Sequence, residues 1–243
     1  MVIEEFMEGE EASFFVVTDG AAALPFQAAQ DHKTIFDGDR GPNTGGMGAY
    51  SPAPVLDAAT ERRVMEEIVT PTIAAMAKEG APYAGVLYIG LMISREGPRV
   101  VEFNCRFGDP ECQAIVPRLE DDILPVFDAV ARGRGLPASL GWRAESSVCV
   151  VLASHGYPGT PRPGDVIGGL EAAGGLPGVN VFHAGTALRD GALVTSGGRV
   201  LGVQALGADI GTAIARAYEA VGRIRFDGMQ WRSDIGRRAL GRS

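Results

Sequence analysis

Residues 100–113 read VVEFNCRFGDPECQ, an apolar start followed by a run of polar and charged side chains. The first residues favour a β-strand, and Glu102 and Asn104 stand two apart, so both side chains are expected on one face. Carboxylate and amide oxygens are hard ligands of the kind that Mg²⁺ takes, usually one or two from protein, with nucleotide phosphates completing the shell. Arg106 adds a fixed cation suited to phosphate or carboxylate. Surface charges at a strand end explain this spacing equally well when it is taken alone.

The composition is that of an ordinary globular protein. The chain has 243 residues, of which 46% are hydrophobic and 21% charged, which suits one large domain or two modest ones. The net charge is −8 without a cluster of Lys and Arg, which argues against general nucleic-acid binding. We find no signal peptide and no apolar run long enough for a membrane span. The 3 cysteines lack metal spacing and favour a reducing compartment, so we expect a cytoplasmic protein without nucleic-acid or membrane partners.

Local patterns predict an α+β protein. Strands are expected at residues 2–6, 12–18, 21–29, 84–94, 99–104, 147–154, 180–184, 192–195 and 199–206. Helices are expected at residues 58–79, with a kink or break at Pro71, and at residues 121–132 and 210–223. Residues 134–143 interrupt the periodicity, so we expect a first domain at residues 1–136 and a second, β-rich domain at residues 137–243.

Residues 30–51 are expected to form one long loop of the kind that is functional or disordered. Its second half, GPNTGGMGAYSP at residues 41–52, is rich in glycine, which lets backbone N–H groups approach an anion closely. Glycine content alone favours a loose surface loop, and the run is neither a Walker A loop nor a GxGxxG turn. Lys33, in the preceding QDHK, could reach phosphate as a point charge, although such a tetrad is more commonly a solvated turn.

Other candidates carry less weight by themselves. Glu4 and Glu11 flank a glycine turn in IEEFMEGEEAS, where carboxylates could accept hydrogen bonds from a base or a ribose, but an acidic surface hairpin is the default interpretation. His32 is expected to be structural or solvated. Arg199 and the turn-like run GYPG at residues 156–159 are interpreted as structural.

Taken together, these segments resemble one family. The runs IEEFMEGEEAS, QDHK, GPNTGGMGAYSP and EFNCRFGDPE occur in the order and wording typical of phosphoribosylamine–glycine ligases, and HGYPG, FHAGT and SGGRVLGV resemble the C-terminal domain of that family. The resemblance implies an ATP-grasp lobe, an antiparallel sheet with helices, followed by a small β-rich domain like a barrel or sandwich. It also implies a reaction of purine biosynthesis, in which ATP drives the joining of glycine to 5-phosphoribosylamine through a glycyl phosphate, giving glycinamide ribonucleotide, ADP and phosphate.

The resemblance assigns roles to single residues. Glu102 and Asn104 are similar to the ligands of a Mg²⁺ or Mn²⁺ ion that bridges the ATP phosphates. Arg106 and Lys33 are similar to catalytic cations, and Asp109 and Glu111 to residues that order the loop or contact the amine substrate. The residues similar to the ATP-binding set are Glu4, Glu5, Phe6, Met7, Glu11, Asn43, Thr44, Gly45 and Gly46.

Members of this family carry an N-terminal substrate domain and the first part of the ATP-grasp domain before the segment that resembles IEEF. We therefore expect this chain to be a fragment with little or no ligase activity alone. Its expected partners are glycine, 5-phosphoribosylamine and a separate N-terminal half. Two alternatives stay open: another carboxylate–amine ATP-grasp ligase, and a non-catalytic nucleotide-binding remnant.

Overall fold

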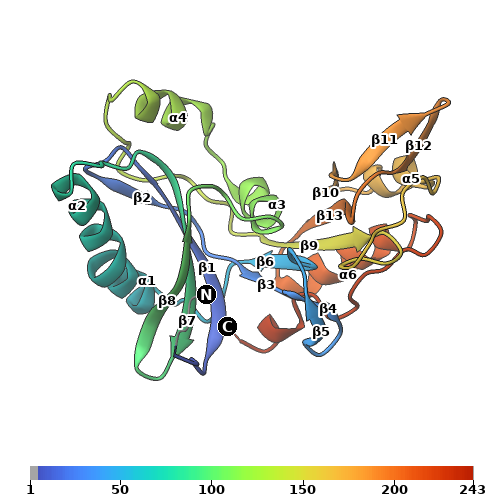
Figure 1. The fold of residues 1–243 in the computed structure, drawn as a ribbon, viewed down its shortest axis with the longest axis horizontal. Helices are drawn as coiled ribbons and strands as arrows, with labels where there is room; N and C mark the ends of the chain where they lie inside the picture. The colour runs from blue at the N-terminus through green and yellow to red at the C-terminus, as the bar shows by residue number, and fades with distance from the viewer. Residues whose placement is uncertain (1–4, 243) are drawn as a thin grey trace. The chain divides into compact units, whose positions relative to one another are not determined.

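The computed structural model describes residues 5–242 and divides into two compact units (Figure 1). The first unit comprises Met1–Gln30, Ala53–Gly108 and Leu119–Trp142, and the second comprises Asp31–Pro52, Asp109–Arg118 and Arg143–Ser243. Each unit is therefore assembled from segments that are far apart in the sequence. The strand expected at residues 2–6 lies mostly outside the described residues, and its last two residues have no regular structure.

The first unit is built on a four-stranded sheet with the order β2-β1-β7-β8. Neighbouring strands are antiparallel, and the bounds are β1 (Glu10–Thr18), β2 (Ala23–Pro25), β7 (Gly85–Ser94) and β8 (Gly97–Asn104). The side chain of Asp19 closes the β1–β2 turn because it accepts hydrogen bonds from the backbone N–H groups of Ala21 and Ala22. The strand expected at residues 21–29 is thus reduced to β2.

A helical segment covers one face of this sheet (Figure 1). It consists of α1 (Ala58–Arg63), a π-helical stretch (Val64–Val69) and α2 (Thr70–Lys78), and α4 (Leu124–Ala131) follows later in the unit. Asp57 caps α1 by accepting the N–H of Thr60 at 2.7 Å. The interruption predicted at Pro71 is present as the π-helical stretch just before it, because proline has no N–H for the regular ladder. Apolar side chains of β1 and β7 form a core with this helix.

The second unit contains a five-stranded sheet with the order β10-β13-β9-β6-β3. The bounds are β3 (Gln30–Asp31), β6 (Gly48–Ser51), β9 (Ser146–Ala153), β10 (Val179–His183) and β13 (Arg199–Gly207). Helix α6 (Ile210–Val221) packs on β13 and β9. Its buried residues are Val221 and three alanines, Ala213, Ala217 and Ala220, whose small side chains allow a close approach. Asp209 caps α6 through the N–H of Thr212 at 2.7 Å.

Two hairpins and several short helices complete the second unit. The hairpins are β4 (Thr34–Phe36) with β5 (Arg40–Asn43) and β11 (Thr186–Arg189) with β12 (Ala192–Thr195). The short helices are α3 (Glu111–Ile115), α5 (Leu170–Gly174) and the 3-10 turns Val116–Arg118 and Arg237–Ala239.

The α+β class with antiparallel sheets is confirmed, whereas the single long loop expected at residues 30–51 is wrong. That segment contains β3, β4, β5 and β6, whose hydrogen-bond partners include a strand about a hundred residues further on: Gly48 pairs with Val150. Within residues 5–242, no helix has the combination of length and apolar character that a membrane crossing requires.

Candidate functional site

The face of the first unit's sheet opposite the helices carries Glu11, Ser13, Glu102 and Asn104 beside the buried apolar residues Phe15 and Val17. We call the part of this face formed by the four polar residues the polar face. Directly opposed residues of antiparallel strands point the same way, and Ser13 opposes Gly90 while Glu11 opposes Met92. Their neighbours Ala12 and Leu91 belong to the core under the helices, so Glu11 and Ser13 project from the other face. The sequence prediction includes Glu11 but not Ser13, which is a small polar residue within an otherwise apolar strand.

A β-bulge in β8 places the predicted metal ligands on this polar face. Val100 opposes Leu91 and Glu102 opposes Gly90, so Val101 is the extra residue of the bulge. Without it, Val100 and Glu102 would share a face; with it, Val100 packs on the core and Glu102 projects from the opposite side. Asn104, opposite Tyr88, lies on the same face as Glu102. The face expected to be shared by these two side chains is therefore present.

Gly90 leaves room for the Glu102 side chain to lie across the sheet. A Cβ atom at Gly90 would be 3.0 Å from Cγ of Glu102 and 3.4 Å from Cε1 of Tyr88. Tyr88 is on the same strand as Gly90, and its hydroxyl lies 3.1 Å from the hydroxyl of Ser13 on β1. The polar face thus has a small residue beside the candidate carboxylate ligand and a buried hydroxyl pair next to it.

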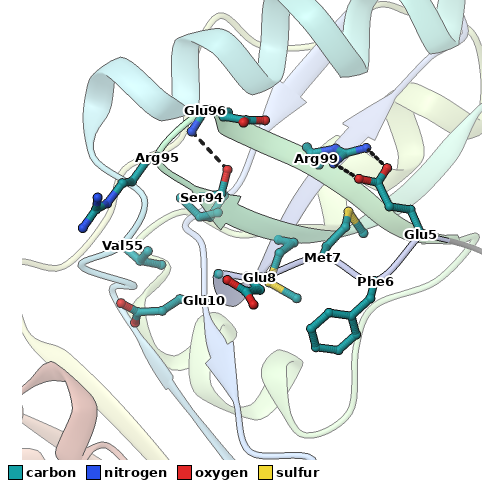
Figure 2. A pocket seen from close by; sticks show the side chains of 13 residues that line it. Glu5, Phe6, Met7, Glu8, Glu10, Val55, Ser94, Arg95, Glu96 and Arg99 are labelled. Atoms are coloured by element: carbon teal, nitrogen blue, oxygen red, sulfur yellow. Dashed lines mark hydrogen bonds and ion pairs between the residues drawn. The ribbon is translucent and has the colours of Figure 1, made fainter.

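Three residues of the expected ATP-binding set, Glu5, Phe6 and Met7, line a hollow at one end of the first unit (Figure 2). Its volume is about 820 Å³, and its lining includes Glu5, Phe6 and Met7 together with the β7–β8 turn. Figure 2 shows the Glu5 carboxylate directed at Arg99, at 2.8 Å, and the hydrogen bond from Arg99 lowers the pKa of Glu5. Glu10 lines the hollow, whereas Glu11 projects from the other face of β1. The predicted ligand Glu4 lies outside the described residues.

The second unit brings Lys33 next to the glycine-rich loop. Thr44 donates hydrogen bonds from its backbone N–H and its hydroxyl to the Lys33 carbonyl, both at 2.7 Å, and the Gly46 N–H donates to the Thr44 hydroxyl at 2.9 Å. The ammonium group of Lys33 lies 3.0 Å from the Asp31 carboxylate. Asn43, which ends β5, is exposed. Lys33 and residues 43–46 therefore form one local cluster in this unit.

The two acidic residues after the metal pair have different surroundings. Asp109 is exposed, accepts a hydrogen bond from Gln113 at 3.0 Å and lies 3.2 Å from the Arg199 guanidinium. Glu111 is the first residue of α3 and is buried. Arg106 is exposed in the loop after β8 and donates to the carbonyl of Phe107 at 2.8 Å. Asp109 is thus placed on a surface, whereas Glu111 is enclosed by protein.

The predicted site residues form two groups. Glu5, Phe6, Met7, Glu11, Glu102, Asn104 and Arg106 belong to the first unit, and Lys33, Asn43, Thr44, Gly45, Gly46, Asp109 and Glu111 to the second. In the described part of the chain, no three His, Cys, Asp or Glu side chains gather as a metal site. Glu102 and Asn104 offer one carboxylate and one amide, the small protein share that suits a metal held mainly by a phosphorylated ligand.

Solved structures share this arrangement of elements. A crystal structure of biotin carboxylase from Campylobacter jejuni matches with a TM-score of 0.69 at 17% identity, covering 96% of this chain and 50% of that one, which shows likeness of fold alone. Phosphoribosylamine–glycine ligase from Thermotoga maritima matches with a TM-score of 0.86 at 36% identity, covering 95% of this chain and 56% of that one. The fold is of the ATP-grasp class, as the sequence predicted.

Matches to two protein domains identify one family within the ATP-grasp class. The ATP-grasp (A) domain of phosphoribosylglycinamide synthetase matches residues 1–112, and the C domain of the same enzyme matches residues 147–238. The chain belongs to the phosphoribosylglycinamide synthetase family.

Curated relatives carry a matching name. The phosphoribosylamine–glycine ligase of Mesorhizobium japonicum is 55% identical over 242 residues, which is 100% of this chain and 57% of that protein. The chloroplastic enzyme of Arabidopsis thaliana is 53% identical, over 99% of this chain and 46% of that protein. The chain therefore spans about half the length of the curated relatives it matches.

Proposed function

We propose that this chain carries nucleotide- and metal-binding residues of a phosphoribosylamine–glycine ligase of purine biosynthesis. In the proposed reaction, the glycine carboxylate attacks the γ-phosphorus of ATP and the bond to ADP breaks, which gives glycyl phosphate. The amine nitrogen of 5-phosphoribosylamine then attacks the carbonyl carbon, loses a proton and displaces phosphate. The product is glycinamide ribonucleotide.

The observation that carries the proposal is the pair Glu102 and Asn104 on the polar face of an ATP-grasp sheet. The bulge at Val101 separates this pair from the core, and Gly90 leaves room for the Glu102 side chain to lie across the sheet. The donor set fits Mg²⁺ or Mn²⁺, which prefer oxygen ligands. Such an ion, bound with ATP, would neutralise charge on the phosphates. Glu102 and Asn104 would hold it, and Glu11 on the same face would accept hydrogen bonds from the ribose.

Cations and backbone groups account for the other proposed roles. Lys33 would act near the phosphates, and Arg106 would steady the acyl phosphate or the substrate phosphate. Residues 43–48 would cover the reacting groups, and the backbone of residues 5–7 would contact the adenine. Asp109 would contact the amine substrate, whereas the burial of Glu111 supports the loop-ordering role among those expected for it. These groups provide charge and position, which suffice for acyl phosphate chemistry without a covalent nucleophile on the protein.

The proposal extends to partners, location and domains. The substrates are glycine and 5-phosphoribosylamine, and a polypeptide that supplies the remaining share of the relatives' sequence would act with this chain. The domain division between residues 136 and 137 is supported by the two family matches, which fall on either side of it. The compact units do not follow this division, because residues 31–52 and 109–118 belong to the same unit as residues 143–243. A cytoplasmic location is supported by the three free cysteines, which suit a reducing compartment.

Reconstitution tests the proposed activity. The chain is mixed with a polypeptide that corresponds to the part of the Mesorhizobium japonicum relative outside its match to this chain; we call this mixture the reconstituted ligase. We expect ADP release that requires both glycine and 5-phosphoribosylamine. Release that depends on a different carboxylate or amine would replace the substrate assignment, and ATP binding without turnover would support the non-catalytic alternative.

Two measurements test the metal assignment: calorimetry measures MgATP binding by the chain and by the reconstituted ligase, and ADP release measures turnover of the reconstituted ligase. Glu102→Ala removes the carboxylate and should lower turnover roughly 100- to 1000-fold, because an uncompensated phosphate charge is costly. Glu66→Ala, at an exposed residue of the helical segment on the opposite face of the sheet, is the matched control and should leave turnover unchanged within about twofold. Equal MgATP binding by the wild type and Glu102→Ala would show that the metal assignment is wrong.

A further inference from the structure

Arg199 reaches the glycine-rich loop from the start of β13. Its Nη1 atom donates to the carbonyl of Gly45 at 2.7 Å and to the carbonyl of Asp109 at 2.6 Å, and it lies 3.2 Å from the Asp109 carboxylate. The side chain is only 23% exposed. One guanidinium therefore joins two loops that are more than sixty residues apart in the sequence.

Tyr157 holds the other backbone group of the same glycine. Its hydroxyl accepts a hydrogen bond from the Gly45 N–H at 2.8 Å, so both polar backbone groups of Gly45 are held by side chains from beyond residue 143. A Cβ at Gly198 would be 2.4 Å from Cδ2 of Tyr157, so only glycine lets the ring lie there. The adjacent residues Gly198 and Arg199 therefore both support Gly45. Gly198 leaves room for the Tyr157 ring, and Arg199 donates to the Gly45 carbonyl.

The packing around the two loop glycines is tight. A Cβ at Gly45 would be 3.0 Å from Cζ of Arg199, so glycine admits the flat guanidinium. Gly46 has a φ of +111°, and its Cβ would be 2.5 Å from Cδ of Pro110. The Gly45 N–H already donates to the Tyr157 hydroxyl, so in this structure it does not point to an open anion site.

We propose that Arg199 and Tyr157 are positioning residues that clamp the turn at residues 44–46 against Asp109. The clamp fixes the backbone next to Lys33 and Asn43, whose side chains then have a defined place from which to contact substrate. Arginine suits this task because its planar fork can serve several oxygens at once, which a single ammonium group does less well. The effect on turnover rests on the proposed function, whereas the effect on loop order does not.

Hydrogen exchange on the complete 243-residue chain tests the loop order. Tyr157→Phe removes one oxygen and should speed exchange of the Gly45 amide about tenfold, as expected for the loss of one ordinary hydrogen bond. Arg199→Met should speed exchange across residues 43–46, and Arg199→Lys should fall between it and the wild type. Arg225→Met, at an exposed arginine of the same unit, is the matched control and should leave these amides unchanged. Wild-type exchange in both Tyr157→Phe and Arg199→Met would overturn the proposal.

Kinetics on the reconstituted ligase test whether the clamp serves the reaction. Arg199→Met should lower kcat roughly 10- to 100-fold while KM for ATP changes less than about threefold, and Arg199→Lys should restore part of kcat. A raised KM for ATP at unchanged kcat would overturn the positioning role. If the wild type itself lacks turnover, the proposed function fails, and the exchange experiment still decides whether the clamp exists. Should Arg199→Met fail to fold, Tyr157→Phe carries both measurements.

Discussion

The polar face of the first unit and the glycine-rich loop of the second differ in what holds them in shape. Glu102 and Asn104 are fixed by a hairpin in which β8 follows β7 after two residues, so nearby backbone sets their direction. Thr44 and Gly46 have hydrogen bonds within their own loop and with Lys33, but Gly45 between them is held by Arg199 and Tyr157, more than a hundred residues away. The first arrangement follows from strand geometry, whereas the second exists only after distant segments have packed. Perturbing each support separately should therefore give different results.

The largest expected effect on stability comes from a substitution beside the β4–β5 hairpin, which leads into the glycine-rich loop. Arg232 is 1% exposed, and its guanidinium donates to Thr34 in β4 at 3.0 Å and to the carboxylates of Asp39 at 3.0 Å and Asp234 at 2.7 Å. Arg232→Met leaves these groups without their buried donor. We expect the free energy of unfolding to fall by about 3 kcal/mol. Urea unfolding measures this, with Arg225→Met, an exposed arginine of the same unit, as the control.

Hydrogen exchange of Arg232→Met tests whether the glycine-rich loop and the polar face have separate supports. Residues 34–46 should lose protection in Arg232→Met, because β4 and β5 lead directly into the loop. The amides of β7 and β8 should keep their local protection at denaturant concentrations where the chain stays folded. Equal loss in both regions would contradict the idea that they have separate supports.

The next effect depends on pH and concerns His32, which lies between β3 and the loop. The side chain is 1% exposed, and within the described residues neither ring nitrogen has a hydrogen-bond partner. Burial, followed by the charges of Arg238 and Arg232, lowers the pKa of His32 from 6.5 to about 3. The folded protein therefore keeps the ring neutral, whereas the unfolded chain takes up a proton below pH 6.5.

Stability should consequently fall as the pH falls from 6.5 toward 3, the window between the two pKa values of His32. At pH 5 the loss from this residue should be about 2 kcal/mol relative to pH 7.5. His32→Phe removes the titration and should flatten this part of the profile, with little change at pH 7.5 because no hydrogen bond is lost. His183→Gln, at an exposed histidine, is the control. An unchanged profile in His32→Phe would contradict a buried neutral ring.

The same contrast explains what the sequence could predict. Strands β7 and β8 and the helical segment from Ala58 to Lys78 agree closely with their predicted ranges, because their patterns are local. Glu102 and Asn104 were also identified from a spacing of two residues. The bulge at Val101 could not be predicted, since it depends on the register with β7.

Segments that depend on distant partners were harder to predict. Residues 30–51 look like a loop because their strands are only two to four residues long, and because β6 pairs with β9, about a hundred residues further on. The sequence predicts a structural role for Arg199 and for the turn containing Tyr157, but it does not reveal that both side chains contact Gly45. The sequence shows only a glycine next to an arginine in SGGR. This pattern does not reveal which aromatic ring packs on the glycine or which loop the arginine binds.

The smallest expected effect tests whether the polar face depends on Gly90. Gly90→Ala places a methyl group 3.0 Å from Cγ of Glu102, a contact that the flexible glutamate relieves by moving. Folding should be preserved or strengthened by up to about 1 kcal/mol, because alanine reduces the freedom of the unfolded chain. The displaced carboxylate should nevertheless weaken MgATP binding by the reconstituted ligase about tenfold. Gly174→Ala makes the same chemical change where no atom lies within 4 Å, and should leave binding unchanged. If Gly90→Ala binds MgATP like the wild type while Glu102→Ala does not, the position of Glu102 is set by the bulge in β8 alone.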